Sequence, residues 1–153
     1  MSSHSSSPSG IERRALGAAL LAVALVRPAQ AERETLEQAV LRFTGGTAPT
    51  AGRVTLEIPP LVENGNTVPV TITVDSSMTE EEHVRRIALF NTRNPQANVI
   101  TARLGPRAGH ARLATRMRLA TSQKLIAVAE LSDGSFWSDS AEVIVTLAAC
   151  VEG

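Results

Sequence analysis

Hydrophobic and polar residues alternate along most of the chain after residue 46, in short runs that favour β-strands. The clearest run is 68–74, where aliphatic residues at even positions alternate with proline and threonine at odd positions. Such a period of two is typical of a strand with one buried face. Pro69 has no backbone N–H, so this strand is predicted at a sheet edge, or with one residue unpaired near its start. Similar runs occupy 54–58, 83–90, 98–104, 111–119, 124–131, 134–138 and 142–149.

Turn-forming residues separate these runs. Asp133-Gly134 is a strong hairpin signal, and the segment 63–66, Glu-Asn-Gly-Asn, is a second turn. Seven or eight short strands separated by such turns predict an all-β fold, an antiparallel β-sandwich. The runs 124–131 and 143–147 are apolar on both faces, as expected of central strands.

The period is helical before residue 46. Leu36, Val40, Leu41 and Phe43 recur at helical spacing, and Gly45-Gly46 follows as a stop signal. The sequence therefore predicts a short N-terminal helix within 32–46, ahead of a sandwich domain at 47–147.

The first 31 residues have the pattern of an export signal. Arg13-Arg14 precedes an apolar stretch at 15–26, and Ala29-Gln30-Ala31 resembles a cleavage site. The apolar stretch is too short to span a bilayer, and the twin arginine favours the Tat route. We expect a signal peptide at 1–31, a periplasmic mature chain and no membrane attachment after cleavage. A buried helix is the alternative, and Arg27-Pro28 disfavours it.

Charge and composition exclude some classes of function. Cleavage after Ala31 would leave twelve basic and fourteen acidic residues, and the chain has no tyrosine. A nearly neutral chain with few aromatic residues argues against nucleic-acid binding. The acidic run 80–82 beside Arg85-Arg86 predicts a solvated face with local ion pairing.

Candidate chemistry is sparse. His83 and His110 lack neighbouring ligands at metal-binding spacing, and no nucleophile elbow or glycine-rich phosphate loop occurs. We therefore predict no metal, no cofactor and no catalytic site of the protein's own. Five arginines form either a basic surface for an anionic partner or a scattered exposed set: Arg103, Arg107, Arg112, Arg116 and Arg118.

Cys150 is the single cysteine, and only residues 151–153 follow it. It has no partner for an internal disulfide, and an unpaired thiol in an exported protein indicates intermolecular pairing or a reactive group. A position at the chain terminus is accessible to other molecules. We therefore predict that Cys150 is the functional residue.

Four segments carry a resemblance to a known family. They are 60–70 (Pro-Leu-Val-Glu-Asn-Gly-Asn-Thr-Val-Pro-Val), Asn94-Pro95, 119–123 (Leu-Ala-Thr-Ser-Gln) and 129–136 (Ala-Glu-Leu-Ser-Asp-Gly-Ser-Phe). In these segments the chain resembles SoxY, the sulfur-carrier subunit of the bacterial Sox system of thiosulfate oxidation.

The resemblance implies an immunoglobulin-like antiparallel β-sandwich that pairs with a second β-sandwich subunit, SoxZ. It also implies a C-terminal arm, here 148–153, whose cysteine carries thiosulfate-derived sulfur covalently; Cys150 aligns with it. The implied partner enzymes are a haem enzyme that loads the sulfur, a hydrolase that releases sulfate and a sulfane dehydrogenase. The protein would then be a carrier rather than an enzyme.

The arm departs from the family pattern, in which glycine pairs flank the cysteine. Here Ala148-Ala149 precedes Cys150, and Val151 and Glu152 follow it. Alanine and valine restrict the backbone, and a carboxylate near the thiol disfavours the thiolate. The alternative function is therefore an interaction or structural partner of a SoxZ-type subunit that carries no sulfur.

Overall fold

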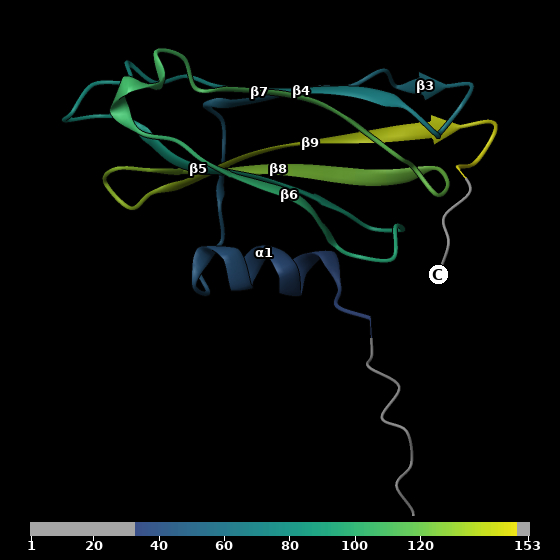
Figure 1. Cartoon of the computed structure of the whole chain (residues 1–153). Helices are drawn as coiled ribbons and strands as arrows, with labels where there is room; N and C mark the ends of the chain where they lie inside the picture. The colour runs from purple at the N-terminus through teal and green to yellow at the C-terminus, as the bar shows by residue number, and fades with distance from the viewer. Residues whose placement is uncertain (1–32, 150–153) are drawn as a thin grey trace, which may run out of the picture. The chain divides into compact units, whose positions relative to one another are not determined.

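The computed structural model describes residues 33–149, which form two packed β-sheets and one α-helix (Figure 1). The six-stranded sheet has the order β1-β9-β8-β5-β6, with β3 also paired to β9, and the three-stranded sheet has the order β2-β4-β7. Pairing is antiparallel except where the short strands β1 and β3 join β9 in parallel. The all-β sandwich with a short helix is confirmed.

The strands have the following bounds, in chain order: β1 Thr50–Ala51, β2 Val54–Glu57, β3 Leu61–Val62, β4 Val68–Val74, β5 Val84–Asn91, β6 Asn98–Arg103, β7 Arg112–Met117, β8 Gln123–Leu131 and β9 Phe136–Val145. A single turn of 3₁₀ helix, η1, spans Pro106–Ala108 between β6 and β7. The predicted signal peptide at 1–31 lies outside the described residues.

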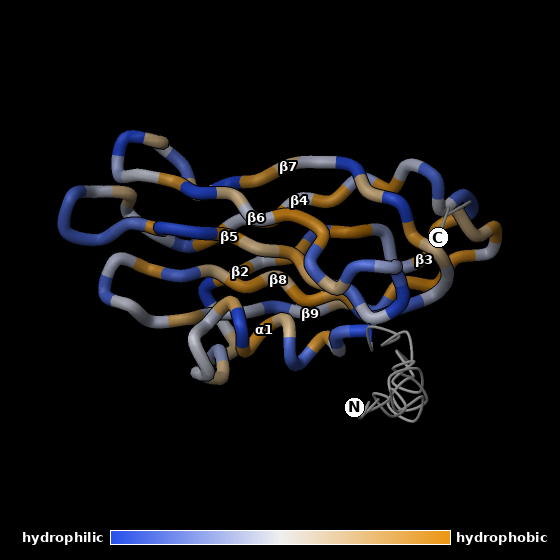
Figure 2. Tube along the Cα trace, turned by 60° about the horizontal axis from the view of Figure 1, so that its bottom comes forward, coloured by the Kyte–Doolittle hydropathy of each residue, from blue (hydrophilic) through white to orange (hydrophobic). Residues whose placement is uncertain are grey.

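The main core lies between the two sheets. On β4, Val68, Val70, Ile72 and Val74 are buried in it, while the odd-numbered residues face outward. On β2, Val54 and Leu56 are buried in the same way, while Thr55 and Glu57 are exposed, and Figure 2 shows hydrophobic stretches along the strands. The period of two in the sequence thus reflects one sheet face turned to the core and one turned to solvent.

Strand β8 is apolar on both faces because each face is covered. Leu125, Ala127 and Ala129 point into the main core, whereas Ile126 and Val128 belong to a second cluster on the outer side of the six-stranded sheet. Helix α1, Leu36–Thr44, contributes Ala39 and Val40 to this second cluster, and it lies across that side of the sheet (Figure 1). The prediction that 124–131 is a central strand is confirmed.

Helix α1 has defined ends. Thr35 is its N-cap and forms a reciprocal capping box with Gln38, and Gly45 ends it in the left-handed conformation at φ 69°. Phe43, in the last turn, makes edge-to-face contacts with Phe90 at 5.8 Å and Phe136 at 6.2 Å between ring centroids. These rings fix the helix to the sheet.

Two strand predictions are wrong. The runs 134–138 and 142–149 form one strand, β9, which ends at Val145, because the polar stretch between them still pairs with β8 from Trp137↔Ala129 to Ala141↔Leu125. β9 is also solvated on part of one face, since Ile144 is 60% exposed. A strand can tolerate polar residues where its neighbours supply the hydrogen bonds.

The strand that carries Pro69 is central, not at an edge, because β4 pairs with both β2 and β7. Pairing with β2 stops at Glu57↔Thr71, however, whereas pairing with β7 continues through Pro69↔Arg116 to Val68↔Met117. Because hydrogen-bonding direction alternates along an antiparallel ladder, residue 69 faces the side that β2 has left. The missing N–H of Pro69 therefore lies where no strand requires it.

Candidate functional site

Cys150, the predicted functional residue, lies outside the described residues. The structure can be followed to Ala149, its immediate neighbour, which is 6% exposed. The part of the candidate site that the structure describes is the segment that leads to the cysteine.

Backbone hydrogen bonds continue beyond the end of β9. Leu61 and Val62 of β3 pair in parallel with Ile144 and Val145. After β9 ends, the Thr146 N–H donates to the Val62 carbonyl at 3.0 Å, and the Leu147 N–H donates to the Glu63 carbonyl at 3.1 Å. The segment after β9 is therefore still bound to the segment that follows β3.

Gly65 and Leu119 extend this attachment to Ala149. The Gly65 N–H donates to the Leu147 carbonyl at 2.9 Å, and the Leu119 N–H donates to the Gly65 carbonyl at 2.8 Å. The Ala149 N–H in turn donates to the Leu119 carbonyl at 3.0 Å. We call these four residues, Gly65, Leu119, Leu147 and Ala149, the C-terminal clasp.

The clasp has no room for a side chain at position 65. Gly65 is buried, and a Cβ there would lie 2.5 Å from the Leu119 carbonyl oxygen and 2.9 Å from the Ala149 nitrogen. It would also lie 3.2 Å from the Val145 side chain. Glycine is required here because three chain segments meet at its Cα.

The side chain of Asn94 fixes the loop that contains Leu119. The Asn94 amide oxygen accepts from the Ala120 N–H at 3.0 Å and from the Gln123 side chain at 2.9 Å. The Asn94 amide nitrogen donates to the Arg118 carbonyl at 2.7 Å. These bonds flank Leu119 on both sides, so Asn94 fixes the loop whose carbonyl receives Ala149.

Three of the four segments that carry the family resemblance thus meet in one place. The turn 63–66 supplies Gly65, the pair Asn94-Pro95 supplies the amide, and 119–123 supplies Leu119 and its neighbours. The sequence predicts a turn at 63–66, and its side-chain pattern does not assign Gly65 or Leu119 to the site. The only signal in the sequence was the glycine within a family motif, since backbone contacts leave no trace in side-chain identity.

Exposed apolar side chains surround the same end. Within residues 33–149, four large hydrophobic residues are exposed. Three of them lie in β3, in β9 and just after β9: Leu61 at 58%, Ile144 at 60% and Leu147 at 61%. Leu61 and Ile144 are partners in the β3–β9 register. This surface leads directly to the residue before the cysteine.

At the opposite end of the sandwich, a carboxylate holds the loop between β4 and β5. Glu82 accepts hydrogen bonds from the Ser77 hydroxyl at 2.6 Å and the Ser77 N–H at 2.7 Å, and Arg53 donates to it at 2.7 Å. The hydrogen bonds from Ser77, with smaller contributions from Ser76 and Arg53, lower the pKa of Glu82 to about 2.

The predicted local pairing of 80–82 with Arg85-Arg86 is wrong, because Glu82 pairs with Arg53 and Arg86 pairs with Glu130.

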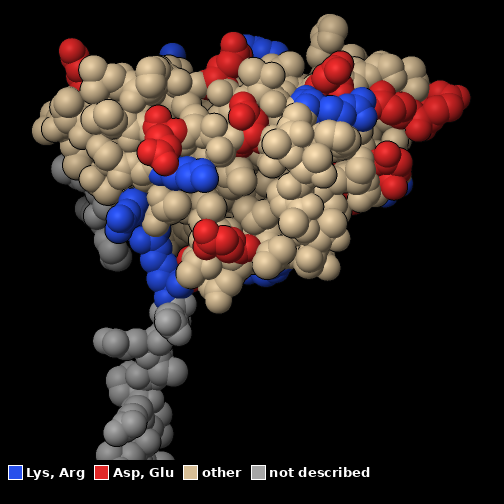
Figure 3. Space-filling view, turned by 180° about the vertical axis from the view of Figure 1, so that it is seen from behind, with Lys and Arg blue, Asp and Glu red and all other residues tan. Residues whose placement is uncertain are grey.

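Within the described part of the chain, the other candidate residues do not assemble into an arrangement typical of a catalytic site. Across residues 33–149, no group of three or more His, Cys, Asp or Glu could hold a metal ion. His110 is exposed, and His83 contacts the Thr79 carbonyl through Nδ1 at 3.0 Å. The candidate arginines are all exposed, and on the face shown in Figure 3 acidic and basic side chains are interspersed.

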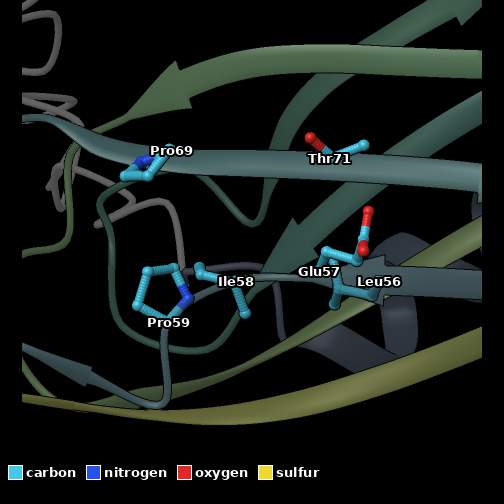
Figure 4. A pocket seen from close by; sticks show the side chains of 6 residues that line it. All are labelled: Leu56, Glu57, Ile58, Pro59, Pro69 and Thr71. Atoms are coloured by element: carbon cyan, nitrogen blue, oxygen red, sulfur yellow. The ribbon is translucent and has the colours of Figure 1, made fainter.

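A shallow hollow of about 350 Å³ lies beside Pro69, where β2 separates from β4 (Figure 4). Leu56, Ile58 and Pro59 line it, with one carboxylate from Glu57 and one hydroxyl from Thr71. Glu57 and Thr71 are partners in the β2–β4 register, and no hydrogen bond joins their side chains within residues 33–149. Among the described residues, no helix has the length and hydrophobicity needed to cross a bilayer.

The fold and the clasp define a β-sandwich whose family motifs gather around its C-terminal segment. The family model described as "Sulfur oxidation protein SoxY" matches residues 40–150, so the chain belongs to the SoxY family. A search of curated proteins gives no match.

Solved structures agree with this assignment. The sulfur carrier protein SoxY from Chlorobium limicola f thiosulfatophilum is 25% identical, with a TM-score of 0.61 over 74% of this chain and 97% of that chain. A superoxide reductase (neelaredoxin) from Ignicoccus hospitalis is 16% identical, with a TM-score of 0.56 over 61% of this chain and 80% of that chain. The second likeness shows a shared fold alone.

Proposed function

We propose that this protein carries sulfur covalently on Cys150 during thiosulfate oxidation. The observation that supports this most directly is the extent of the family match, which runs from residue 40 to the cysteine itself at residue 150. The similarity to the Chlorobium sulfur carrier supports it independently. The gathering of family motifs around the segment that leads to Cys150 gives the proposal a structural basis.

The chemistry requires enzymes other than the carrier. Joining the outer sulfur of thiosulfate to the Cys150 sulfur forms an S–S bond and releases the thiol proton and an electron pair, which a haem enzyme would accept. A hydrolase would then add water across the terminal S–S bond, releasing sulfate and leaving a persulfide. A sulfane dehydrogenase would oxidise the remaining sulfur, with oxygen atoms from water and electrons passing to its own acceptor.

The proposed setting is the periplasm, after removal of residues 1–31. The proposed permanent partner is a SoxZ-type β-sandwich subunit. Since Leu61, Ile144 and Leu147 are exposed apolar residues beside the C-terminal segment, they are candidates for contact with a partner.

Mass spectrometry tests the carrier role. The full chain with its SoxZ-type subunit is incubated with thiosulfate and the haem loading enzyme, and the peptide containing Cys150 is analysed. We expect a thiosulfonate adduct on Cys150 and none on a Cys150→Ser variant. An unmodified Cys150 beside a fully loaded glycine-flanked family member would contradict the proposal.

A second candidate function is a SoxY-like interaction partner that carries no sulfur. The observation that favours it is the attachment of the chain up to Ala149, whose N–H is bound to Leu119. In cells that depend on this gene for thiosulfate oxidation, a Cys150→Ser variant would then support normal oxidation. Loss of oxidation in that variant would favour the carrier.

A further inference from the structure

The charged residues are unevenly distributed along the chain. Between Glu82 and Glu130 no aspartate or glutamate occurs, whereas this stretch contains nine arginine and lysine residues. The nearly neutral charge of the whole chain conceals this segregation. The stretch forms β5, β6, η1, β7 and most of β8, so one part of the sandwich carries basic side chains without acidic side chains of its own.

Strands β6 and β7 lie at edges of the two sheets, on the same side of the sandwich. β6 ends the order of the six-stranded sheet, and β7 ends that of the three-stranded sheet; Figure 1 shows them in different layers. β2, at the far edge of the smaller sheet, contacts β8 and β9, and the short connection through η1 joins β6 to β7. We call this side the basic edge, after the arginines that it carries: Arg103, Arg107, Arg112, Arg116 and Arg118.

The five guanidinium groups of the basic edge are exposed, and within residues 33–149 none of them forms an ion pair or a hydrogen bond. The strand next to β7, β4, contains no charged residue. Glu57 on β2 is therefore separated from β7 by an uncharged strand. Unpaired positive charges that gather on one surface raise its electrostatic potential and attract anionic groups.

The acidic loop 75–82 lies near one end of the basic edge only. The Val74 N–H donates to the Ala111 carbonyl at 2.9 Å, so the start of β7 is beside this loop. The other end of β7 leads through Arg116 and Arg118 to the clasp. These two arginines are therefore the members of the basic edge that lie farthest from the acidic loop and nearest to the candidate site.

A hollow beside Arg118 has a lining suited to carboxylates. It measures about 580 Å³ and has no acidic residue in its lining, which includes three side-chain amides: Asn94, Gln96 and Asn98. Amide and guanidinium N–H groups donate hydrogen bonds to carboxylates, and arginine does so with two parallel bonds. Glu63, the acidic residue of the turn at this end, forms no ion pair within residues 33–149.

We propose that the basic edge, with Arg116 and Arg118 at its centre, is a docking surface for an acidic surface of an enzyme that acts on this protein. That the enzyme belongs to thiosulfate oxidation rests on the proposed function. The charge segregation, the absence of internal ion pairs and the position beside the clasp all support this use. The alternative is that arginines on exposed strand edges only prevent edge-to-edge association of this chain.

A transient partner fits the basic edge better than a permanent one. Burying several arginines in a permanent interface is costly, because each charge loses its hydration. Charges on an exposed rim instead accelerate the encounter with an oppositely charged surface, by about a hundredfold or more. Exposed apolar residues, which suit a permanent partner, lie at the opposite edge of the six-stranded sheet: Leu61, Ile144 and Leu147.

An Arg116→Gln/Arg118→Gln double variant tests the docking surface. Both side chains are exposed, so the fold should persist, and thermal unfolding checks this. Arg42→Glu is the matched control, since it changes the net charge by the same amount. Arg42 is an exposed residue of α1 and lies outside the basic edge.

The readout is the rate at which the chain, in complex with its SoxZ-type subunit, associates with enzymes from the same organism. The three enzymes are the haem loading enzyme, the sulfate-releasing hydrolase and the sulfane dehydrogenase. Rates are compared at ionic strengths of about 0.01 M and about 0.15 M, between which the Debye length falls from about 30 Å to about 8 Å.

We expect the double variant to associate about tenfold more slowly with at least one enzyme at the low ionic strength, and the difference to shrink at the higher one. Arg42→Glu should stay within about twofold of the unmodified chain, because its charge is outside the contact. Equal slowing in both variants would mean that net charge alone steers the encounter, which contradicts a defined docking surface.

Unchanged association of the double variant with all three enzymes, or no association of the unmodified complex with any of them, would overturn the proposal. Normal association together with oligomers of the double variant would do so as well, since the arginines would then only protect the strand edges. The docking surface and the carrier role fail separately. Slower association without a thiosulfate adduct on Cys150 retains the docking surface and rejects the carrier role, whereas a normal adduct with unchanged association does the reverse.

Discussion

The two ends of β4 are secured in different ways. At the Val68 end, the clasp joins three chain segments through backbone hydrogen bonds around Gly65. At the Val74 end, the loop to β5 is held by the Glu82 carboxylate, which binds Ser76, Ser77 and Arg53. The Val68 end depends on the absence of a side chain at Gly65, whereas the Val74 end depends on the charge of the Glu82 side chain.

This difference predicts that pH affects the stability of the Val74 end but not that of the Val68 end, where the sulfur chemistry is proposed. Neutral backbone groups keep their hydrogen bonds across the pH range in which carboxylates titrate, so the clasp should hold the C-terminal segment alike in acid and at neutrality. The loop from β4 to β5 includes Met78, and Arg53, which pairs with Glu82, directly precedes β2; both residues have positive φ. Those residues adopt a costly backbone conformation that the carboxylate network helps to maintain.

The largest expected effect is that of Gly65→Ala. A Cβ at 2.5 Å from the Leu119 oxygen forces the clasp apart, and we expect the free energy of unfolding to fall by roughly 2–3 kcal/mol, as for overpacked sites. Chemical denaturation at neutral pH measures this. The matched control is Gly105→Ala, where φ is −135° and a Cβ meets nothing within 4 Å.

The Gly105→Ala control should stay within about 0.5 kcal/mol of the unmodified protein or be slightly more stable, since alanine restricts the unfolded chain. Equal losses of unfolding free energy in the two variants would mean that crowding by a Cβ at position 65 does not cause the destabilisation. The loss in Gly65→Ala should also be the same at pH 7 and pH 3, since no titrating group takes part in the clasp.

Glu82→Gln should have the next largest effect, and that effect should depend on pH. Loss of the charge weakens the hydrogen bonds from Ser77 and Arg53, and we expect a cost of about 1–2 kcal/mol at pH 7, reduced because the side chain is 35% exposed. The folded pKa of about 2 lies below the ordinary value of 4.5. The stabilisation is therefore complete above about pH 4.5 and is lost as the pH falls through 2.

The free energies of unfolding of the unmodified protein and of Glu82→Gln, compared between pH 7 and pH 2, measure this dependence. The difference between these two free energies should narrow steadily below pH 4.5. Glu80→Gln is the control, because Glu80 is exposed and makes no ion pair within the described residues. A difference for Glu82→Gln that is constant with pH would show that its charge does not hold the loop.

The sequence predicted side-chain periodicity well and backbone contacts poorly. The alternation in 68–74 and the double apolar character of 124–131 follow directly from burial, and the structure confirms both. The Asp133-Gly134 turn is confirmed as well, with Gly134 at φ 84° and the Ser135 N–H bound to the Asp133 carboxylate. Each of these features is encoded in the residues that form it.

The clasp could not be predicted in this way. Its bonds connect Gly65, Leu119 and Ala149, which are far apart in the sequence, and every residue except proline has the same N–H and C=O groups. The arrangement depends on how the strands bring three segments together. Likewise, the pairing of Glu82 with Arg53 spans 29 residues, so local charge pattern favoured the wrong partner.

Ser122→Ala should have the smallest effect, and it is the sharpest test of the difference between the ends. The Ser122 hydroxyl accepts from the Val145 N–H at 2.8 Å, which makes it a side-chain contact to β9 at the clasp end. Because Ser122 is exposed, water can replace the hydroxyl, and we expect a cost of about 0.5 kcal/mol without pH dependence. Ser140→Ala is the control on β9, since the Ser140 hydroxyl makes no hydrogen bond within residues 33–149. If the clasp end is held by its backbone, Ser122→Ala costs less than Glu82→Gln at pH 7. A larger cost for Ser122→Ala would mean that side chains, and not the bonds around Gly65, secure the segment before Cys150.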